Sequence, residues 1–248
     1  MHALTGKNIV VIGGSRGVGR RVAEVGLDGG ARVLAVARHE ESLRRLSQDC
    51  PGVEVLALDA SDEHAPAKVF SVVRPDILVL SAGVFPPVSP LHELSWQAFA
   101  VNWEADVKIA FHFCKAALSA PLPAGATVIL ISSGAAIGGS PISGGYAGAK
   151  RTQLFIANYS QKESDRLGLG LRFMSLAPRI MPDTELGKHA VAGYSHYLGI
   201  PETDFIQGMG PAPSASSVAS AVVELSTSLE RPQGNAFIVS GAGLETIP

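Results

Sequence analysis

The sequence predicts a doubly wound α/β fold, with a parallel sheet of seven strands and helices on both of its faces. Short runs rich in valine, isoleucine and leucine alternate with longer segments of helical periodicity along the 248 residues. The runs are apolar throughout, as strands are when helices cover both faces of a parallel sheet. A glycine-rich turn directly after the first run is also typical of strand–helix junctions in such sheets.

Seven runs have the length and composition of buried strands. They are residues 8–12, 32–37, 53–58, 76–80, 127–132, 171–176 and 236–240. With no internal repeat and no shift in composition that would mark a linker, residues 1–248 are expected to form a single domain. Prolines, glycines and aromatic residues interrupt the alternation at 179–213. This segment is expected to cover a site, and an irregular surface excursion is the alternative.

Composition argues against several classes of partner. The net charge is −2, the pI is near 6.4 and the basic residues are dispersed, so no face for nucleic acid is expected. The two cysteines fit neither a disulfide framework nor a metal-ligand spacing, as in proteins of reducing compartments. No apolar run reaches the roughly 18 residues of a membrane span. A soluble, cytoplasmic protein with no metal or membrane partner is therefore expected.

The stretch "GGSRGVGRRVAEVGL" follows the first predicted strand and places glycines at 13, 17 and 19. Glycine lets the backbone approach a pyrophosphate closely, while the free N–H groups and positive dipole of the following helix hold an anion. Ordinary tight turns use the same residues. At the first strand–helix junction of a long α/β chain, however, the pattern favours dinucleotide binding.

A second stretch, "GGYAGAK", places Tyr146 and Lys150 four residues apart. In a helix this spacing is about one turn, so the two side chains share one face. A nearby cation favours phenolate and pulls a tyrosine pKa down from about 10, toward the range useful for proton transfer. From these residues alone, an exposed pair on a solvated helix face remains the alternative.

With the glycine turn and this pair, the chain resembles the short-chain dehydrogenase/reductase family, which has a Rossmann-like fold, from about Lys7 to about Gly243. Two further positions match the family. Ser133 lies thirteen residues before the tyrosine, and Asn102 lies in the helix after the fourth strand. The resemblance implies an oxidoreductase that interconverts a carbonyl and a secondary alcohol. A nicotinamide-nucleotide-sensing regulator without turnover is the alternative.

The resemblance also implies a role for each of the four residues. Tyr146 is the general acid. Lys150 lowers the tyrosine pKa and binds the nicotinamide ribose, and Ser133 holds the substrate oxygen. Asn102 bends its helix and holds a water that connects the lysine to solvent.

The choice of nicotinamide cofactor depends on the end of the second strand. Ala37 stands where an acid would select NAD(H), and Arg38 follows it, with Arg16 as a second cation in the glycine turn. NADP(H) is therefore favoured over NAD(H), although Glu40 and Glu41 could partly neutralise Arg38. The full set of implied cofactor residues is Gly13, Ser15, Arg16, Gly17, Val18, Gly19, Arg38, Asp59, Ala60, Ala82, Gly83, Tyr146, Lys150, Pro178 and Ile180.

Some positions depart from the family pattern. Arg179 replaces the glycine that normally follows Pro178, and Thr184 is six residues past that proline instead of five. The carboxamide contact usually made there is therefore in doubt. The predicted pocket walls at 85–92 and 134–142 are small and uncharged, which favours a small, mainly apolar carbonyl substrate.

Assembly is the last expectation from the sequence. The helix expected at 95–118 and the one that begins near Ser143 carry apolar residues on more than one side. Family members commonly pair through these helices, so a homodimer or homotetramer is expected.

Overall fold

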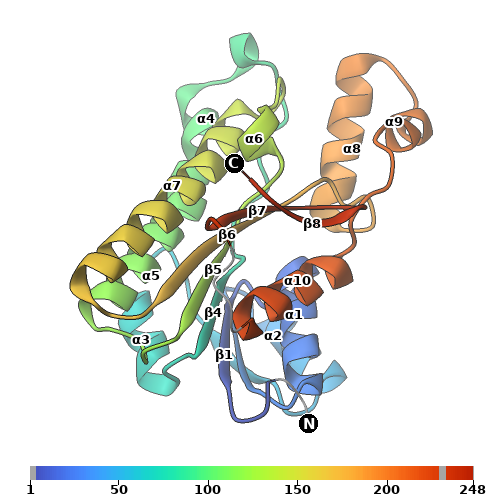
Figure 1. Cartoon of the computed structure of the whole chain (residues 1–248). Helices are drawn as coiled ribbons and strands as arrows, with labels where there is room; N and C mark the ends of the chain where they lie inside the picture. The colour runs from blue at the N-terminus through green and yellow to red at the C-terminus, as the bar shows by residue number, and fades with distance from the viewer. Residues whose placement is uncertain (1–3, 229–232, 248) are drawn as a thin grey trace.

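Eight strands form one sheet in the order β3-β2-β1-β4-β5-β6-β7-β8 in the computed structural model, which describes residues 4–228 and 233–247 (Figure 1). All neighbouring pairs are parallel except β7 and β8. The strands are β1 Asn8–Ile12, β2 Arg32–Ala37, β3 Glu54–Ala57, β4 Ile77–Leu80, β5 Thr127–Ile131, β6 Arg172–Pro178, β7 Ala236–Ser240 and β8 Gly243–Thr246. The doubly wound α/β class is confirmed.

Helices cover both faces of the sheet. One face carries α1 Gly17–Asp28, α2 Glu40–Asp49 and α10 Ala215–Thr227, and the other carries α3 Ala65–Val72, α5 Lys108–Ser119 and α7 Gly144–Leu167 (Figure 1). The remaining helical segments are η1 Leu91–Glu93, α4 Trp96–Asn102, the π-helical turn Trp103–Val107, α6 Ala135–Gly138, α8 Glu185–Leu198 and α9 Glu202–Gly208.

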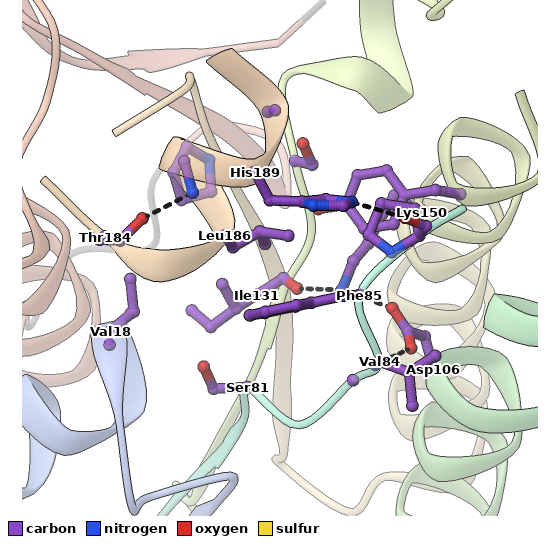
Figure 2. Close-up of a pocket in the computed structure, with 18 of the residues that line it drawn as sticks. Val18, Ser81, Val84, Phe85, Asp106, Ile131, Lys150, Thr184, Leu186 and His189 are labelled. Atoms are coloured by element: carbon purple, nitrogen blue, oxygen red, sulfur yellow. Dashed lines mark hydrogen bonds and ion pairs between the residues drawn. The ribbon is translucent and has the colours of Figure 1, made fainter. Parts of the chain in front are cut away.

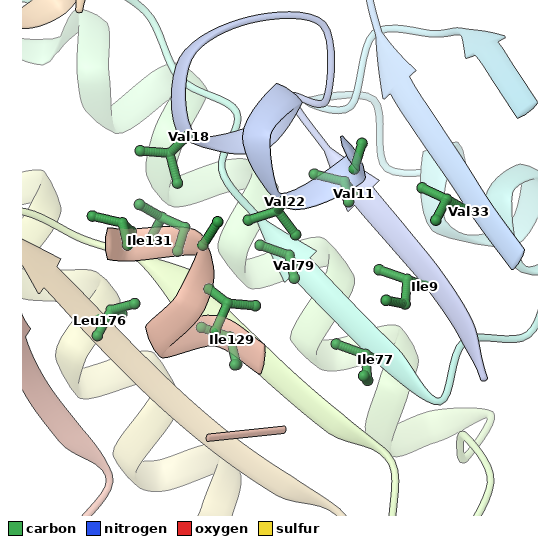
Figure 3. Packing of buried hydrophobic residues seen from close by; sticks show 14 of the residues in the cluster. Ile9, Val11, Val18, Val22, Val33, Ile77, Val79, Ile129, Ile131 and Leu176 are labelled. Atoms are coloured by element: carbon green, nitrogen blue, oxygen red, sulfur yellow. The ribbon is translucent and has the colours of Figure 1, made fainter. Parts of the chain in front are cut away.

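The core forms two layers because side chains along each strand alternate between the two faces of the sheet. Ile9 and Val11 of β1 pack toward α1 and α10, as Figure 3 shows, whereas Val10 and Ile12 pack toward α3 and α5. Both sets are buried. This two-sided burial is the reason that the strand sequences are apolar throughout.

The sequence analysis missed the eighth strand. β8 joins β7 through a tight turn and pairs with it in antiparallel fashion at the edge of the sheet. Its residues are mostly exposed, so it lacks the apolar run by which a buried strand is recognised. The segment 179–213 also differs from one of its two interpretations. Helices α8 and α9 occupy most of it, so the segment is largely regular.

Candidate active site

A cleft of about 750 Å³ opens at the carboxyl ends of the parallel strands, where ligands bind in open α/β sheets. All but two of the residues expected in the cofactor site and the catalytic group line this cleft. The exceptions are Gly19, which lies under the glycine turn, and Asn102, which is buried behind the wall. The structure therefore brings residues that are far apart in the sequence to one edge of the sheet.

Each of the three motif positions requires glycine for its own structural reason. A Cβ at Gly13 would lie 2.5 Å from the backbone nitrogen of Ala82, and one at Gly19 would lie 2.2 Å from the carbonyl oxygen of Gly13. These two positions hold the turn against its neighbours. Gly17 has a φ of +54° and opens onto free space. At the start of α1 no side chain caps the helix, so its first N–H groups can meet an anion.

Tyr146 and Lys150 lie in the amino-terminal part of α7 and face the sheet. Their residues are 9% and 6% exposed, so the alternative of a solvated pair is excluded. Lys150 Nζ lies 5.6 Å from the centroid of the Tyr146 ring and donates to the carbonyl oxygen of Ile131 at 3.1 Å. Ser132 Oγ donates to the carbonyl oxygen of Lys150 at 2.8 Å, which ties this part of α7 to the end of β5. Ser133, the next residue, lines the same cleft.

The electrostatics of this group differ from the sequence expectation. Burial raises the pKa of Tyr146, and neither the ammonium of Lys150 nor the hydroxyl of Ser133 reverses the rise. Burial acts to lower the pKa of Lys150, but the negative charge of Asp106 outweighs it and the pKa is raised. At neutral pH the site therefore holds a neutral phenol beside a charged ammonium. Such a phenol can donate a proton.

Asp106 is a buried charged residue of the cleft that the sequence analysis did not single out. It lies in the π-helical turn, is 1% exposed, and places Oδ2 3.2 Å from Lys150 Nζ (Figure 2). Its Oδ1 accepts a hydrogen bond from the backbone N–H of Val84 at 3.1 Å. The sequence signal was weak, because Asp106 follows Asn102 by about one helical turn but shares the stretch "VNWEADVKIAF" with the charged residues Glu104 and Lys108.

Asn102 ends α4, directly before the π-helical turn, so the regular α-helix is interrupted at this residue. Its Nδ2 donates to the carbonyl oxygen of Val84 at 2.9 Å. Its buried Oδ1 has no hydrogen-bond partner among the described residues. A buried acceptor of this kind needs a partner, which is compatible with the water that the resemblance implies. That water remains a prediction.

At the adenosine end of the cleft, Asp59 accepts from the backbone N–H and the hydroxyl of Ser61, both through Oδ1, and these bonds lower its pKa. Arg38 is exposed at the cleft. Glu41, one of the two acids considered as its partners, accepts instead from Arg44 and Arg45. The structure therefore does not support neutralisation of the Arg38 charge by Glu41, which the sequence had left open.

Arg16 makes contacts that the sequence did not suggest. Its guanidinium donates to Glu185 at 3.0 Å and lies 4.6 Å from the centroid of the Phe85 ring. The opposite face of the cleft is formed by α8. The ring of His189 in this helix stacks on the ring of Phe85, with 5.7 Å between the two centroids (Figure 2). Thr184 caps α8 by accepting from the N–H of Gly187. The hydroxyl of Thr184 thus has a structural role at the start of α8.

Further along α8, Tyr194 donates to Ser140 at 2.8 Å and stacks on Phe205 of α9 at 5.2 Å. Tyr194 and Phe205 line the same cleft as Tyr146. Residues of the segment 179–213 thus form a wall of the cleft that contains Tyr146, Lys150 and Ser133.

The fold and this site define a nucleotide-binding α/β protein with a buried tyrosine and lysine at the sheet edge. The chain belongs to the short chain dehydrogenase family, whose model matches residues 7–194. The family expected from the sequence is confirmed. A crystal structure of a glucose/ribitol dehydrogenase from Brucella melitensis has the same fold, with a TM-score of 0.79, 21% identity and 96% of each chain covered.

Similar proteins of known name are reductases and dehydrogenases. Human L-xylulose reductase is 33% identical over 106 residues, which are 42% of this chain and 43% of that protein. The short chain dehydrogenase/reductase AacuD of Aspergillus aculeatus is 27% identical over 224 residues, covering 82% and 78% of the two chains. D-erythrulose reductase of Gallus gallus is 28% identical over 107 residues, covering 43% and 44%. The match therefore spans less than half the length of the two sugar reductases.

Family membership implies a nicotinamide dinucleotide, and the residues present fit one. The uncapped start of α1 and the open turn at Gly17 suit a pyrophosphate. Both hydrogen bonds from Ser61 to Asp59 end on Oδ1, so Oδ2 can accept from an adenine amino group.

Across the described residues, no helix is long and apolar enough to cross a lipid bilayer.

Proposed function

We propose that the protein is an NADP(H)-dependent oxidoreductase that interconverts a carbonyl and a secondary alcohol on a small, mainly apolar substrate. The observation that carries the proposal is the buried Tyr146–Lys150 pair beside Ser133 in one cleft with the glycine turn. A sensor that only binds the dinucleotide has no need of a buried phenol next to a buried ammonium, because burying such groups is costly.

Each residue has a defined task in carbonyl reduction. The bound cofactor supplies a hydride to the carbonyl carbon. As negative charge builds on the carbonyl oxygen, Tyr146 transfers its phenolic proton to it and becomes phenolate. Ser133 donates a hydrogen bond to the same oxygen and fixes it within reach of the phenol. Lys150 stabilises the phenolate by its charge, while Asn102 orders the water that returns the proton.

The same fold holds the cofactor along the cleft. In the proposed mode, Gly13, Ser15, Gly17 and Val18 face the pyrophosphate. The adenine contacts Asp59 and Ala60, while Ala82, Gly83, Pro178 and Ile180 form the wall toward the nicotinamide ring. Gly19 supports the turn from below.

Selection of NADP(H) is proposed to rest on Arg38. A guanidinium meets a 2′-phosphate through charge-assisted, often bidentate hydrogen bonds worth about 1.5–3 kcal/mol each. No acid stands at Ala37 to accept from a free ribose hydroxyl. Arg16 already donates to Glu185 and lies over Phe85, so a smaller share of this contact is proposed for it.

The substrate is proposed to be a small, uncharged ketone. The cleft wall at Tyr194 and Phe205 offers aromatic surface and the hydroxyl of Tyr194, which donates to Ser140 beside it. Similarity to reductases named for L-xylulose and D-erythrulose makes hydroxylated ketones a suitable part of a test panel. We also propose a cytoplasmic location and a homodimer or homotetramer, paired through α4, α5 and α7.

The test is consumption of NADPH and NADH with a panel of neutral ketones, measured on the parent and on Arg38→Ala. The parent should prefer NADPH. The substitution should raise the KM for NADPH by about 10- to 100-fold and leave that for NADH almost unchanged. Ala37→Asp adds an acid at the end of β2 and should shift the cofactor preference further from NADPH toward NADH. Binding of NADPH without turnover on any carbonyl would favour the sensor instead.

A further inference from the structure

The carboxylate of Asp106 is buried in a place where a charge is costly. It reaches the end of β4 from the π-helical turn, and a Cβ at Gly83 would lie 2.8 Å from each of its oxygens. Oδ1 accepts from the N–H of Val84, while Oδ2 lies 3.2 Å from Lys150 Nζ. The nearest described counter-charge is therefore the lysine of the catalytic group. Removing that partner would leave an uncompensated buried carboxylate.

The contacts of Lys150 show which partner each N–H group of its ammonium can reach. An ammonium has three N–H groups. One is directed to the carbonyl oxygen of Ile131 at 3.1 Å, and Asp106 attracts a second (Figure 2). The third remains for the cofactor ribose or the tyrosine. Asp106 and Ile131 thus hold the flexible lysine side chain from two sides, with its ammonium near Tyr146.

We propose that Asp106 is a positioning residue for the reaction, whose carboxylate holds the ammonium of Lys150 beside Tyr146 and offsets part of its positive charge. The proposal rests on the proposed function, in which Tyr146 transfers the proton. The carboxylate sets the pH at which the phenol gives up its proton. It touches neither substrate nor reacting atoms and acts only through the lysine and its field.

The charged groups near Tyr146 decide in which direction the loss of Asp106 would shift the pKa of Tyr146. Helices α4 and α6 and strand β5 carry no titratable side chain. The π-helical turn carries Asp106 and the exposed Glu104, which pairs with Lys108. Across the cleft lie Arg179 and the His189 ring, whose Nε2 lies 2.9 Å from the carbonyl oxygen of Pro86.

After burial, which raises the pKa of Tyr146, Lys150 and Ser133 act to lower it and Asp106 acts to raise it. Without the negative charge of Asp106, the pKa of Tyr146 should therefore fall. Alcohol oxidation needs the phenolate, so its rate rises as pH passes through this pKa. The rising limb should move to lower pH when the carboxylate is removed.

The test is Asp106→Asn, which keeps the shape and the acceptor for the Val84 N–H. Ultraviolet absorbance of tyrosinate, taken as the difference from Tyr146→Phe in each background, gives the pKa of Tyr146 without turnover. That pKa should fall, and the rising limb of alcohol oxidation should move to lower pH by the same amount. Glu104→Gln is the matched control, because it removes an exposed carboxylate from the same turn, and it should shift neither.

A folded Asp106→Asn with an unchanged Tyr146 titration would overturn the proposal, as would an equal shift in Glu104→Gln. If Asp106→Asn does not fold, carbon-13 resonances of the Asp106 carboxyl in the parent provide the test. These resonances should show an inflection at the pH where Tyr146 titrates, and the inflection should vanish in Tyr146→Phe. A parent without this inflection would also overturn the proposal. A parent without turnover on any ketone would instead count against the proposed function.

Discussion

Replacement of Gly145 by alanine should push apart α4 and α7, the helices that meet directly before Tyr146. Gly145 precedes Tyr146 and lies where α7 meets α4. A Cβ at this position would be 2.1 Å from the carbonyl oxygen of Phe99. The obstacle is backbone, so no side chain can rotate away, and α4 would have to move by at least about 1.3 Å to reach an ordinary contact. Trp103 Nε1 donates to the carbonyl oxygen of Gly145 and would be displaced with it.

The size of the effect follows from this overlap. Overpacking typically costs about 1–3 kcal/mol, and a backbone obstacle puts the cost near the upper end. For a chain of this length each kcal/mol lowers Tm by about 2–4 °C, so Gly145→Ala should melt about 6–12 °C below the parent. Differential scanning calorimetry measures this directly. Activity should fall as well, because the first turn of α7 carries Tyr146.

The neighbouring glycine is the matched control. A Cβ at Gly144 would lie 3.7 Å from a ring carbon of Phe99, which is an ordinary van der Waals contact. Alanine is also the better helix former, by up to about 1 kcal/mol. Gly144→Ala should therefore melt at or slightly above the parent temperature. If Gly145→Ala melts with the parent, or if both variants lose the same stability, the close approach of α4 and α7 is refuted.

Two further predictions concern assembly and thiol reactivity. Phe111 and Phe155 are 46% and 59% exposed on α5 and α7, so light scattering at micromolar concentration should give a dimer or tetramer. A monomeric mass would exclude it. Burial raises the pKa of Cys114 to about 12, whereas Cys50 is only half-buried, so a thiol reagent should modify one cysteine in the native protein and two after unfolding. Rapid native modification of both would contradict the burial of Cys114.

Much of the fold could be predicted from the sequence, because its signals are local. The inner strands of the parallel sheet are buried on both faces and read as apolar runs, whereas β8 is exposed at the edge and does not. The wall built from α8 and α9 was harder to recognise. Helix α8 begins at a Thr184 cap and ends at Gly199 in the left-handed conformation, so its boundary residues also read as loop signals.

The site could be predicted in part for a similar reason. Spacing along one helix brought Tyr146 and Lys150 together, and the family pattern added Ser133 and Asn102. The pairing of Asp106 with Lys150 joins the π-helical turn to α7 and depends on tertiary packing. The raised pKa of Tyr146 could not be predicted either, because it depends on how deeply the packed helices bury the phenol.

The central claim is that Tyr146 supplies the proton for carbonyl reduction. Its most direct test is the turnover of Tyr146→Phe with NADPH and a ketone that the parent reduces, measured beside the binding of NADPH alone. The hydroxyl lost by this substitution is the proposed proton donor, while the buried ring remains. Turnover should fall by roughly 10² or more with cofactor binding largely intact. Turnover close to that of the parent would contradict the assignment of Tyr146 as the general acid.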